Sequence, residues 1–108
     1  MGCDMKNEYG TPMDSNGYVP TIMQKSERCF MCGRSGLLCR HEIYGNAYRD
    51  KSKAFGLWVW LCPECHNEVH FVHAEQKFWL REQGQIAAQE HYGWTENEFR
   101  AKFGKCYK

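Results

Sequence analysis

The sequence has no long apolar run, no repeat and no marked excess of charge of either sign. No apolar stretch approaches the roughly 20 residues that a membrane-spanning helix needs. We find no secretory signal pattern, internal repeat or low-complexity tract. The formal net charge is +1 over 108 residues, so the chain is neither strongly acidic nor strongly basic. We therefore expect one small globular domain, no membrane association and a cytoplasmic location.

Cysteine is the residue type that stands out. The chain has seven cysteines, and four of them form two CxxC pairs, Cys29-Phe-Met-Cys32 and Cys62-Pro-Glu-Cys65. An odd number with this spacing favours metal ligation in a reducing cytoplasm over a secreted disulfide framework. Two thioredoxin-like redox pairs would need a βαβ pattern, which is absent from the sequence. We therefore predict a closed tetrahedral zinc site, which would also stabilise a domain with a modest core.

Positive charge is concentrated in residues 28–53. This range carries six basic and two acidic side chains, a net charge of +4, whereas residues 1–27 have a net charge of −2 and residues 54–108 of −1. Such a basic segment is expected to face the phosphates of a nucleic acid. On charge alone, an ordinary solvated loop explains the segment equally well.

Local patterns predict a leading arm followed by an α+β domain. Residues 1–17 are rich in Gly, Asn, Asp and Ser, which is typical of a flexible arm, so the folded domain is expected over residues 18–108. Two strands are expected at 37–44 and 57–61, and a polar, basic loop is expected to join them over 45–56.

A helical pattern begins at His66, just after the second thiolate pair. Gly84 is expected to weaken or bend this helix midway, and Gly93 is expected to end it. A zinc knuckle formed by the first thiolate pair, Cys29 and Cys32, two strands and a helix that starts at the second thiolate pair form the treble-clef arrangement. The positive N-terminal end of the helix would favour thiolates placed there.

One further helix is predicted near the C-terminus. Thr95-x-x-Glu98 is a capping box that would open this helix, and Gly104 would stop it. The predicted fold class is thus a small, zinc-stapled α+β domain of the treble-clef or ββα-metal type, with helices at its C-terminus.

Three histidines follow the zinc pairs. His66, His70 and His73 have the spacing that places side chains on one face of a helix. We predict that His66 and His70 bind a second metal, and we leave His73 outside the ligand set. A solvated stripe of imidazoles on the surface is the alternative.

The end of the first predicted strand supplies the residues that would complete this second site. If the hairpin packs against the helix, His41 and Glu42 come to face the helix histidines. Two helix imidazoles and one strand ligand make an open site for a divalent cation, with room for water and a phosphate. A strand residue would then take a proton from the attacking water. A polar strand end without a role is the alternative.

The run from Cys29 to His70 resembles the HNH (ββα-metal, His-Me finger) endonuclease superfamily. It is most similar to small phage and prophage proteins with a four-cysteine zinc site, and the resemblance covers about residue 20 to the C-terminus. The motifs that carry it are Leu61-Cys-Pro-Glu-Cys-His-Asn67, His-Glu-Ile-Tyr-Gly at 41–45 and Arg49-x-Lys-Ser52.

The resemblance implies roles for four of these residues. His41 takes the place of a metal ligand and Glu42 that of the base, while His66 and His70 match the pair on the helix. The catalytic set is then His41, Glu42 and His66, and the second metal is held by His41, His66 and His70.

Two positions depart from the family pattern. Glu42 stands where the family usually has a base histidine, so His41 could act as the base and Glu42 could touch the metal instead. Leu57 stands where the family has a central asparagine, which braces the loop that carries the base. Asn46 is a possible substitute for that asparagine.

The expected function is therefore metal-dependent hydrolysis of DNA phosphodiester bonds, with zinc as the structural metal and Mg²⁺ or Mn²⁺ as the catalytic one. The DNA backbone would contact the basic residues Arg40, Arg49, Lys51 and Lys53. The resemblance implies a phage or prophage protein in the cytoplasm of a bacterial host.

Two other functions are compatible with the sequence. One is a non-catalytic zinc module that binds DNA or a protein through a degenerate HNH site. The other is a redox-sensing zinc protein that uses the remaining cysteines, Cys3, Cys39 and Cys106.

Overall fold

A computed structural model describes residues 5–108 of the chain, so Cys3 lies outside the described residues. The described part is a small α+β fold with one two-stranded antiparallel sheet, formed by β1 (Cys39–Glu42) and β2 (Trp58–Leu61). Both strands lie inside the predicted ranges. Arg40 pairs with Trp60 and His41 with Val59, so the two pairs present their side chains on opposite faces of the sheet.

The connection between the strands contains a helix where the sequence predicted only a loop. A 3₁₀ turn, η1 (Asn46–Tyr48), leads into α1 (Arg49–Ala54), and that part of the prediction is wrong. A helix of six residues is too short to show a helical period in the sequence. It is held by tertiary contacts instead, because the buried Ser52 hydroxyl accepts a hydrogen bond from the Tyr44 N–H and donates one to the Tyr44 carbonyl.

Three helices follow the sheet: α2 (Pro63–Phe71), α3 (Ala74–Tyr92) and α4 (Glu96–Phe103). The single helix predicted from His66 to Gly93 is therefore two helices, and α2 begins directly after its N-cap, Cys62. The predicted stops are confirmed, since Gly93 and Gly104 have positive φ angles of 71° and 87°. The capping box of Thr95 and Glu98 is also confirmed at the start of α4.

Gly84 lies inside α3 and permits close packing there. A Cβ atom at this position would lie 2.9 Å from the Tyr44 Oη and 3.0 Å from the Ile43 Cγ2. Gly84 is buried within an uninterrupted helix. Gly84 therefore lets α3 approach the chain just after β1, and the predicted weakening or bending of the helix there stays a prediction.

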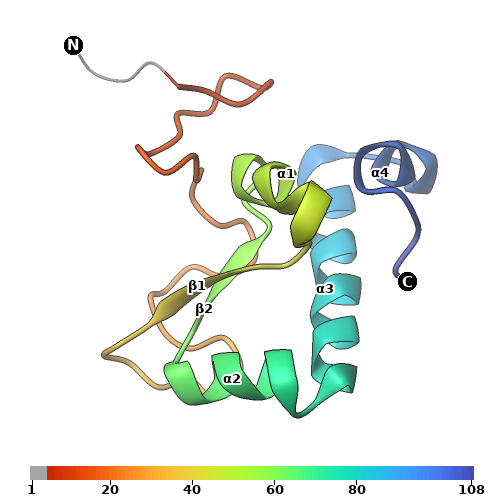
Figure 1. The fold of residues 1–108 in the computed structure, drawn as a ribbon. Coiled ribbons are helices and arrows are strands. Elements are labelled where there is room, and N and C mark those ends of the chain that lie inside the picture. Colours follow the sequence, from red (N-terminus) through yellow and green to blue (C-terminus); the bar gives the residue numbers. More distant parts are fainter. Residues whose placement is uncertain (1–4) are drawn as a thin grey trace.

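The hairpin lies against α3, with α2 at one end of that long helix and α1 and α4 near the other (Figure 1). The buried core joins the sheet to α3 and α4 and is largely aromatic and aliphatic; its largest fully buried members include Tyr44, Phe99, Phe103, Leu57, Leu61 and Leu80. Among residues 5–108, no helix has both the length and the apolar character needed to cross a bilayer.

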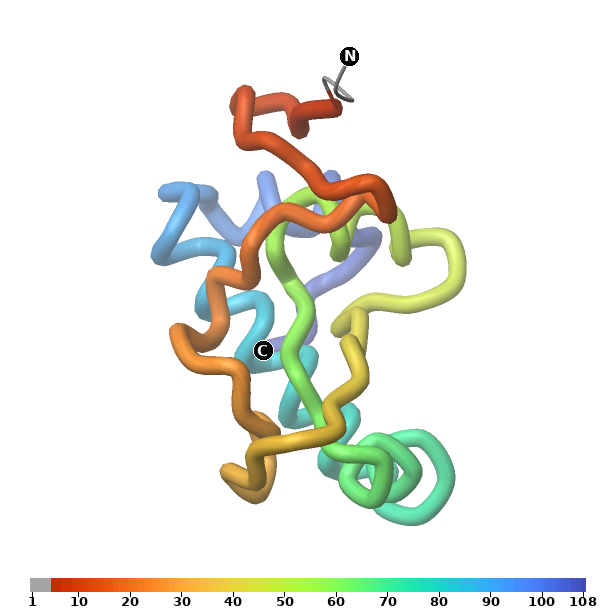
Figure 2. Tube along the Cα trace, turned by 90° about the vertical axis from the view of Figure 1, so that its left-hand side faces the viewer, coloured from red at the N-terminus to blue at the C-terminus, as the bar shows by residue number. Residues whose placement is uncertain are grey.

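The chain before the sheet runs along the outer edge of β2 (Figure 2). The backbone N–H of Phe30 donates to the Trp60 carbonyl over 2.8 Å. Further upstream, the Tyr9 ring stacks on Tyr92 at 5.1 Å between centroids, and the Trp94 indole N–H donates to the Tyr9 hydroxyl. The boundary between arm and domain at residue 17 stays a prediction.

Candidate functional site

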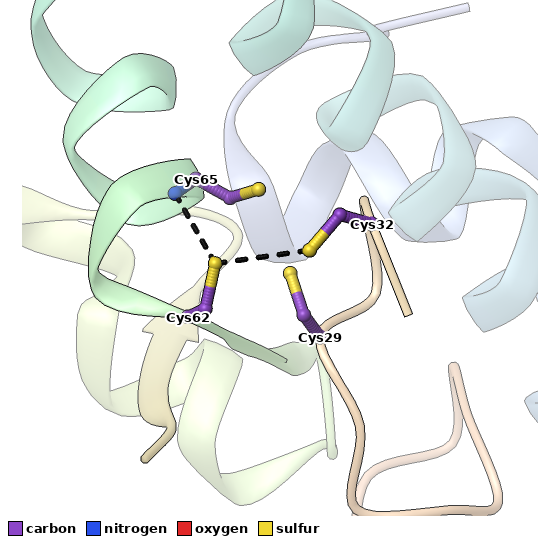
Figure 3. A group of neighbouring side chains, drawn as sticks. All are labelled: Cys29, Cys32, Cys62 and Cys65. Carbon is purple, nitrogen blue, oxygen red and sulfur yellow. Dashed lines mark hydrogen bonds between the residues drawn. The ribbon is translucent and has the colours of Figure 1, made fainter. Parts of the chain in front are cut away.

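Four cysteine sulfurs meet between the knuckle and the start of α2 (Figure 3). The Sγ atoms of Cys29, Cys32, Cys62 and Cys65 all lie within 4.8 Å of one another. Cys29 and Cys62 are buried, whereas Cys32 is exposed. The two CxxC pairs thus form one four-cysteine cluster that could bind a metal such as zinc.

The spacing of the sulfurs fits a tetrahedral ion. A zinc–sulfur bond of about 2.3 Å places two sulfurs of a regular tetrahedron about 3.8 Å apart. The Sγ atoms of Cys32 and Cys62 lie 3.8 Å apart, and no disulfide joins them. The cluster therefore has the size of a zinc site.

Backbone N–H groups around the cluster favour thiolates. The N–H of Cys65, in the first turn of α2, donates to the Cys62 Sγ. Burial acts to raise the pKa of Cys29, but surrounding N–H groups, including that of Cys62, outweigh it and lower the pKa to about 6. Burial and the neighbouring sulfurs raise the pKa of Cys65. A metal cation would remove that conflict, because it binds all four sulfurs as thiolates.

Three imidazoles form a second group beside the sheet. One ring nitrogen each from His41, His66 and His70 lies within 4.8 Å of the others. The Nε2 atoms of His66 and His70 lie 3.1 Å apart, and the His41 ring centroid lies 5.4 Å and 5.1 Å from theirs. His41 is buried, His66 is half-buried and His70 is exposed, so the group opens to solvent on one side.

Local structure explains why these three residues meet. His41 pairs with Val59 in the sheet, so its side chain leaves the face that α2 covers. His66 and His70 are one helical turn apart and lie on the same face of α2. The start of α2 therefore presents Cys62 and Cys65 to the thiolate cluster, and His66 and His70 follow directly in the chain.

The environment keeps His41 neutral. Burial, together with the electrostatic influence of His70, His66, Lys77 and Arg81, lowers the pKa of His41 to about 3. The buried His41 Nε2 has no hydrogen-bond partner in residues 5–108. A neutral imidazole with an unused buried nitrogen is suited to binding a metal. Regular tetrahedral ligation by imidazole nitrogens places them about 3.3 Å apart, close to the separation of His66 and His70.

His73 does not share a helix face with the other histidines. The helix α2 ends at Phe71, and His73 is the N-cap of α3. The His73 ring lies near Glu68 and Glu75 instead, with its Nδ1 3.3 Å from the Glu75 carboxylate. The prediction of one helical face for His66, His70 and His73 is therefore wrong for His73, because the chain turns after Phe71.

Glu42 is next to His41 but makes different contacts. Its carboxylate accepts a hydrogen bond from the Tyr18 hydroxyl and pairs with the Arg49 Nε at 2.9 Å. It is not a member of the three-imidazole group, although its charge partly opposes the lowering, by burial, of the pKa of His66. Burial and the bond to Glu42 raise the pKa of Tyr18 to about 12, so Tyr18 donates to Glu42 as a neutral hydroxyl.

The loop after β1 is braced by a serine rather than an asparagine. Leu57, where the resemblance to HNH endonucleases led us to expect an asparagine, is fully buried in the core. Ser52 makes both hydrogen bonds to the Tyr44 backbone that fix the loop. Asn46 has a left-handed backbone with φ of 53° and lies in the lining of the cleft described next.

A cleft of about 240 Å³ opens beside the imidazoles. Strand β1, the loop after it, α2 and α3 all contribute to its lining: His41, Glu42, Ile43, Gly45, Asn46, His70, Lys77 and Arg81. Lys77 and Arg81 were not anticipated from the sequence. Their spacing of four residues was visible, but nothing local indicated that α3 folds back over the imidazoles.

The four basic residues predicted to contact DNA lie outside that lining. Arg40 stacks on Tyr18, with its Cζ 4.3 Å from the ring centroid, and pairs with Asp14. It borders a cavity of about 690 Å³ beside Trp58 and Trp60. The other three make separate contacts: Arg49 with Glu42, Lys51 with the Lys102 carbonyl and Lys53 with the Tyr18 ring. Their binding to DNA stays a prediction.

Two of the remaining cysteines are described by the structure, and neither belongs to the four-cysteine cluster. Cys39 lies in β1, and Cys106 accepts a hydrogen bond from the buried Gln85 amide. The metal-binding part of the prediction is therefore supported by residue geometry alone. Comparisons of the chain with protein-family models, with curated proteins and with solved structures found no match.

Proposed function

We propose that this protein is an HNH-type endonuclease of the treble-clef class, which hydrolyses DNA phosphodiester bonds with a structural zinc and a second divalent metal. One observation carries the proposal: α2 brings together two separate donor sets, four thiolates with Cys29 and Cys32 and three imidazoles with His41 of β1. Thiolates that close around a metal suit a structural site. Imidazoles at the edge of a cleft suit a site that remains open to a substrate.

The three imidazoles fit the second metal. His41 offers a buried nitrogen without a partner, and His66 and His70 offer nitrogens at ligand spacing. Neutral imidazoles suit Zn²⁺ or Ni²⁺ better than Mg²⁺ or Mn²⁺, and a divalent cation held there would supply positive charge to a phosphodiester and to its leaving oxygen. The thiolate cluster fixes the start of α2, and so it sets the position of His66 and His70 relative to β1.

Glu42 is the proposed base. Because His41 belongs to the imidazole group, Glu42 is the neighbouring strand residue that is left to take a proton from water. Arg49 and Tyr18 hold the Glu42 carboxylate in one orientation through two hydrogen bonds. Ser52 fixes the loop that follows, which is the role of the missing asparagine.

A non-catalytic zinc module is the second candidate. It is favoured by the contacts of Glu42, because a carboxylate engaged by both Arg49 and Tyr18 is a weaker proton acceptor than a free one. In that case the protein would bind DNA or a protein partner without cleaving a phosphodiester.

Nicking of supercoiled plasmid by the zinc-loaded protein separates the two candidates. Wild type is compared with and without added Mg²⁺, Mn²⁺ or Ni²⁺, beside His66→Ala and a control, His91→Ala, which removes an exposed imidazole far along α3. Metal-dependent nicking that is lost only in His66→Ala supports the nuclease. DNA binding without nicking by wild type, under every metal tested, would favour the non-catalytic module.

A further inference from the structure

Two cationic side chains of α3 lie in the imidazole cleft without an anionic partner. Lys77 and Arg81 are one helical turn apart and both line the cleft. In the described part of the chain, no carboxylate lies within ion-pair distance of either side chain. Four other cations are paired, Arg34 with Glu64, Arg40 with Asp14, Arg49 with Glu42 and Lys102 with Glu8, whereas unpaired ones such as Lys25 and Arg100 lie exposed outside this cleft.

Arg81 is held in place by its surroundings but lacks a hydrogen-bond acceptor. Its Nε is buried and has no partner in residues 5–108. Its backbone carbonyl accepts a hydrogen bond from the Tyr44 hydroxyl, and its guanidinium lies near the rings of Phe78 and Tyr107. Burying a charged N–H group without an acceptor costs free energy, so an anion bound at this position would be stabilising.

The other groups in the cleft leave its positive charge uncompensated. Glu42 is the acidic residue of the lining. Its carboxylate already forms an ion pair with Arg49 and accepts a hydrogen bond from Tyr18. The remaining polar side chains of the lining are the imidazoles of His41 and His70 and the amide of Asn46. A cavity of about 240 Å³ with two free cations has room for one phosphate group and parts of its substituents, but not for a whole duplex.

We propose that Lys77 and Arg81 form a phosphate-binding pair, which seats one phosphodiester group of a nucleic-acid chain next to His41 and His70. The guanidinium would donate two parallel hydrogen bonds, and the ammonium would act as a compact charge one turn away. That the phosphate belongs to a substrate rests on the proposed function. The binding of a phosphodiester is a separate property and is tested without cleavage.

Binding is measured by isothermal titration calorimetry and ³¹P NMR on protein that holds one equivalent of zinc, with no other divalent metal added. The probes are a thymidine dinucleotide with one phosphodiester, its uncharged methylphosphonate analogue and inorganic phosphate. The variants are Lys77→Gln with Arg81→Gln, and a control of equal charge change, Lys25→Gln with Arg100→Gln, at two exposed positions outside the cleft. Circular dichroism and zinc content establish that each variant is folded.

The dinucleotide is expected to bind wild type and the control variant alike, and to bind the Lys77 and Arg81 variant at least about tenfold more weakly. The methylphosphonate should bind all three proteins weakly. Equal dinucleotide affinity in the two double variants would overturn the pair, and so would binding of inorganic phosphate without binding of the dinucleotide. A protein that shows Lys77- and Arg81-dependent binding but never nicks DNA would retain the pair and lose the proposed function.

Discussion

The Nε2 atoms of His66 and His70 lie 3.1 Å apart on one face of α2. Two neutral imidazoles at that distance form one N–H···N hydrogen bond, in which one ring donates to the lone pair of the other. A metal ion can replace that proton and bind both nitrogens, with the His41 Nε2 as the third ligand. The two donor sets therefore predict that the protein binds two metal ions.

Wild type is expected to bind two equivalents of Zn²⁺ or Co²⁺, and His66→Ala one. The loss is specific because the four-cysteine cluster does not use His66. Metal content after gel filtration, measured by mass spectrometry, gives the count, and the charge-transfer absorption of Co²⁺ reports the thiolate site separately. His91→Ala serves as the control and should keep two equivalents. One equivalent in wild type would argue against an imidazole site.

Cys62→Ser is expected to leave the chain unfolded at room temperature. Cys62 supplies one sulfur of the cluster and is also the N-cap of α2. Its replacement therefore removes a metal ligand and destabilises the helix that carries His66 and His70. Structural zinc contributes about 10–16 kcal/mol in small zinc domains, more than a marginal fold can lose. Circular dichroism and zinc content would show this, with Cys39→Ser as a folded control. A cooperative thermal transition in Cys62→Ser would contradict it.

Gly84→Ala is expected to destabilise the fold by about 1–2 kcal/mol, although alanine is the better helix former. The added methyl group would collide with the Tyr44 Oη and Ile43 Cγ2. Urea unfolding gives the free energy. Gly45→Ala is the control, because a Cβ there meets no atom within 4 Å and its φ of −91° is ordinary for alanine. Unchanged or increased stability of Gly84→Ala would mean that α3 does not pack this closely.

Acid should destabilise wild type more than His41→Gln. The pKa of His41 is lowered to about 3 in the folded chain from 6.5, so below pH 6.5 the unfolded chain takes up a proton that the folded chain refuses. This group therefore leaves stability unchanged above pH 6.5 and reduces it as the pH falls toward 3. Between pH 6.5 and 5.5 the difference should grow by about 1 kcal/mol.

The measurement for His41 is urea unfolding at each pH on protein with one equivalent of zinc. Acid loss of zinc from the thiolates affects both proteins, so the difference between them isolates His41. If the free energy of unfolding changes with pH in the same way for wild type and His41→Gln, the prediction is wrong.

Glu42→Gln is expected to reduce plasmid nicking by at least about 100-fold, the lower range for a general base, while metal stoichiometry stays at two. The amide keeps the size of the carboxylate but does not take a proton from water. Tyr18→Phe removes one hydrogen bond to Glu42 and should reduce nicking less. Nicking by Glu42→Gln at the wild-type rate would mean that another group acts as the base.

Features that depend on residues close together in the chain could be predicted from the sequence. The CxxC spacing brings two sulfurs together within one turn, so the four-cysteine cluster followed once the two pairs met. The capping box at Thr95 and the left-handed stops at Gly93 and Gly104 are also local, because they use hydrogen bonds between residues a few positions apart. The spacing of His66 and His70 placed them on one face of a helix for the same reason.

Other features depend on packing between distant parts of the chain and could not be predicted. Helix α1 is too short to be visible in the sequence and is fixed by the contact of Ser52 with Tyr44. The turn after Phe71 removes His73 from the imidazole face, and the same turn sends α3 back over β1, where Gly84 allows close approach. Only this packing of α3 beside β1 brings Lys77 and Arg81 into the cleft with His41. Such contacts join residues about 40 positions apart, and no local pattern records them.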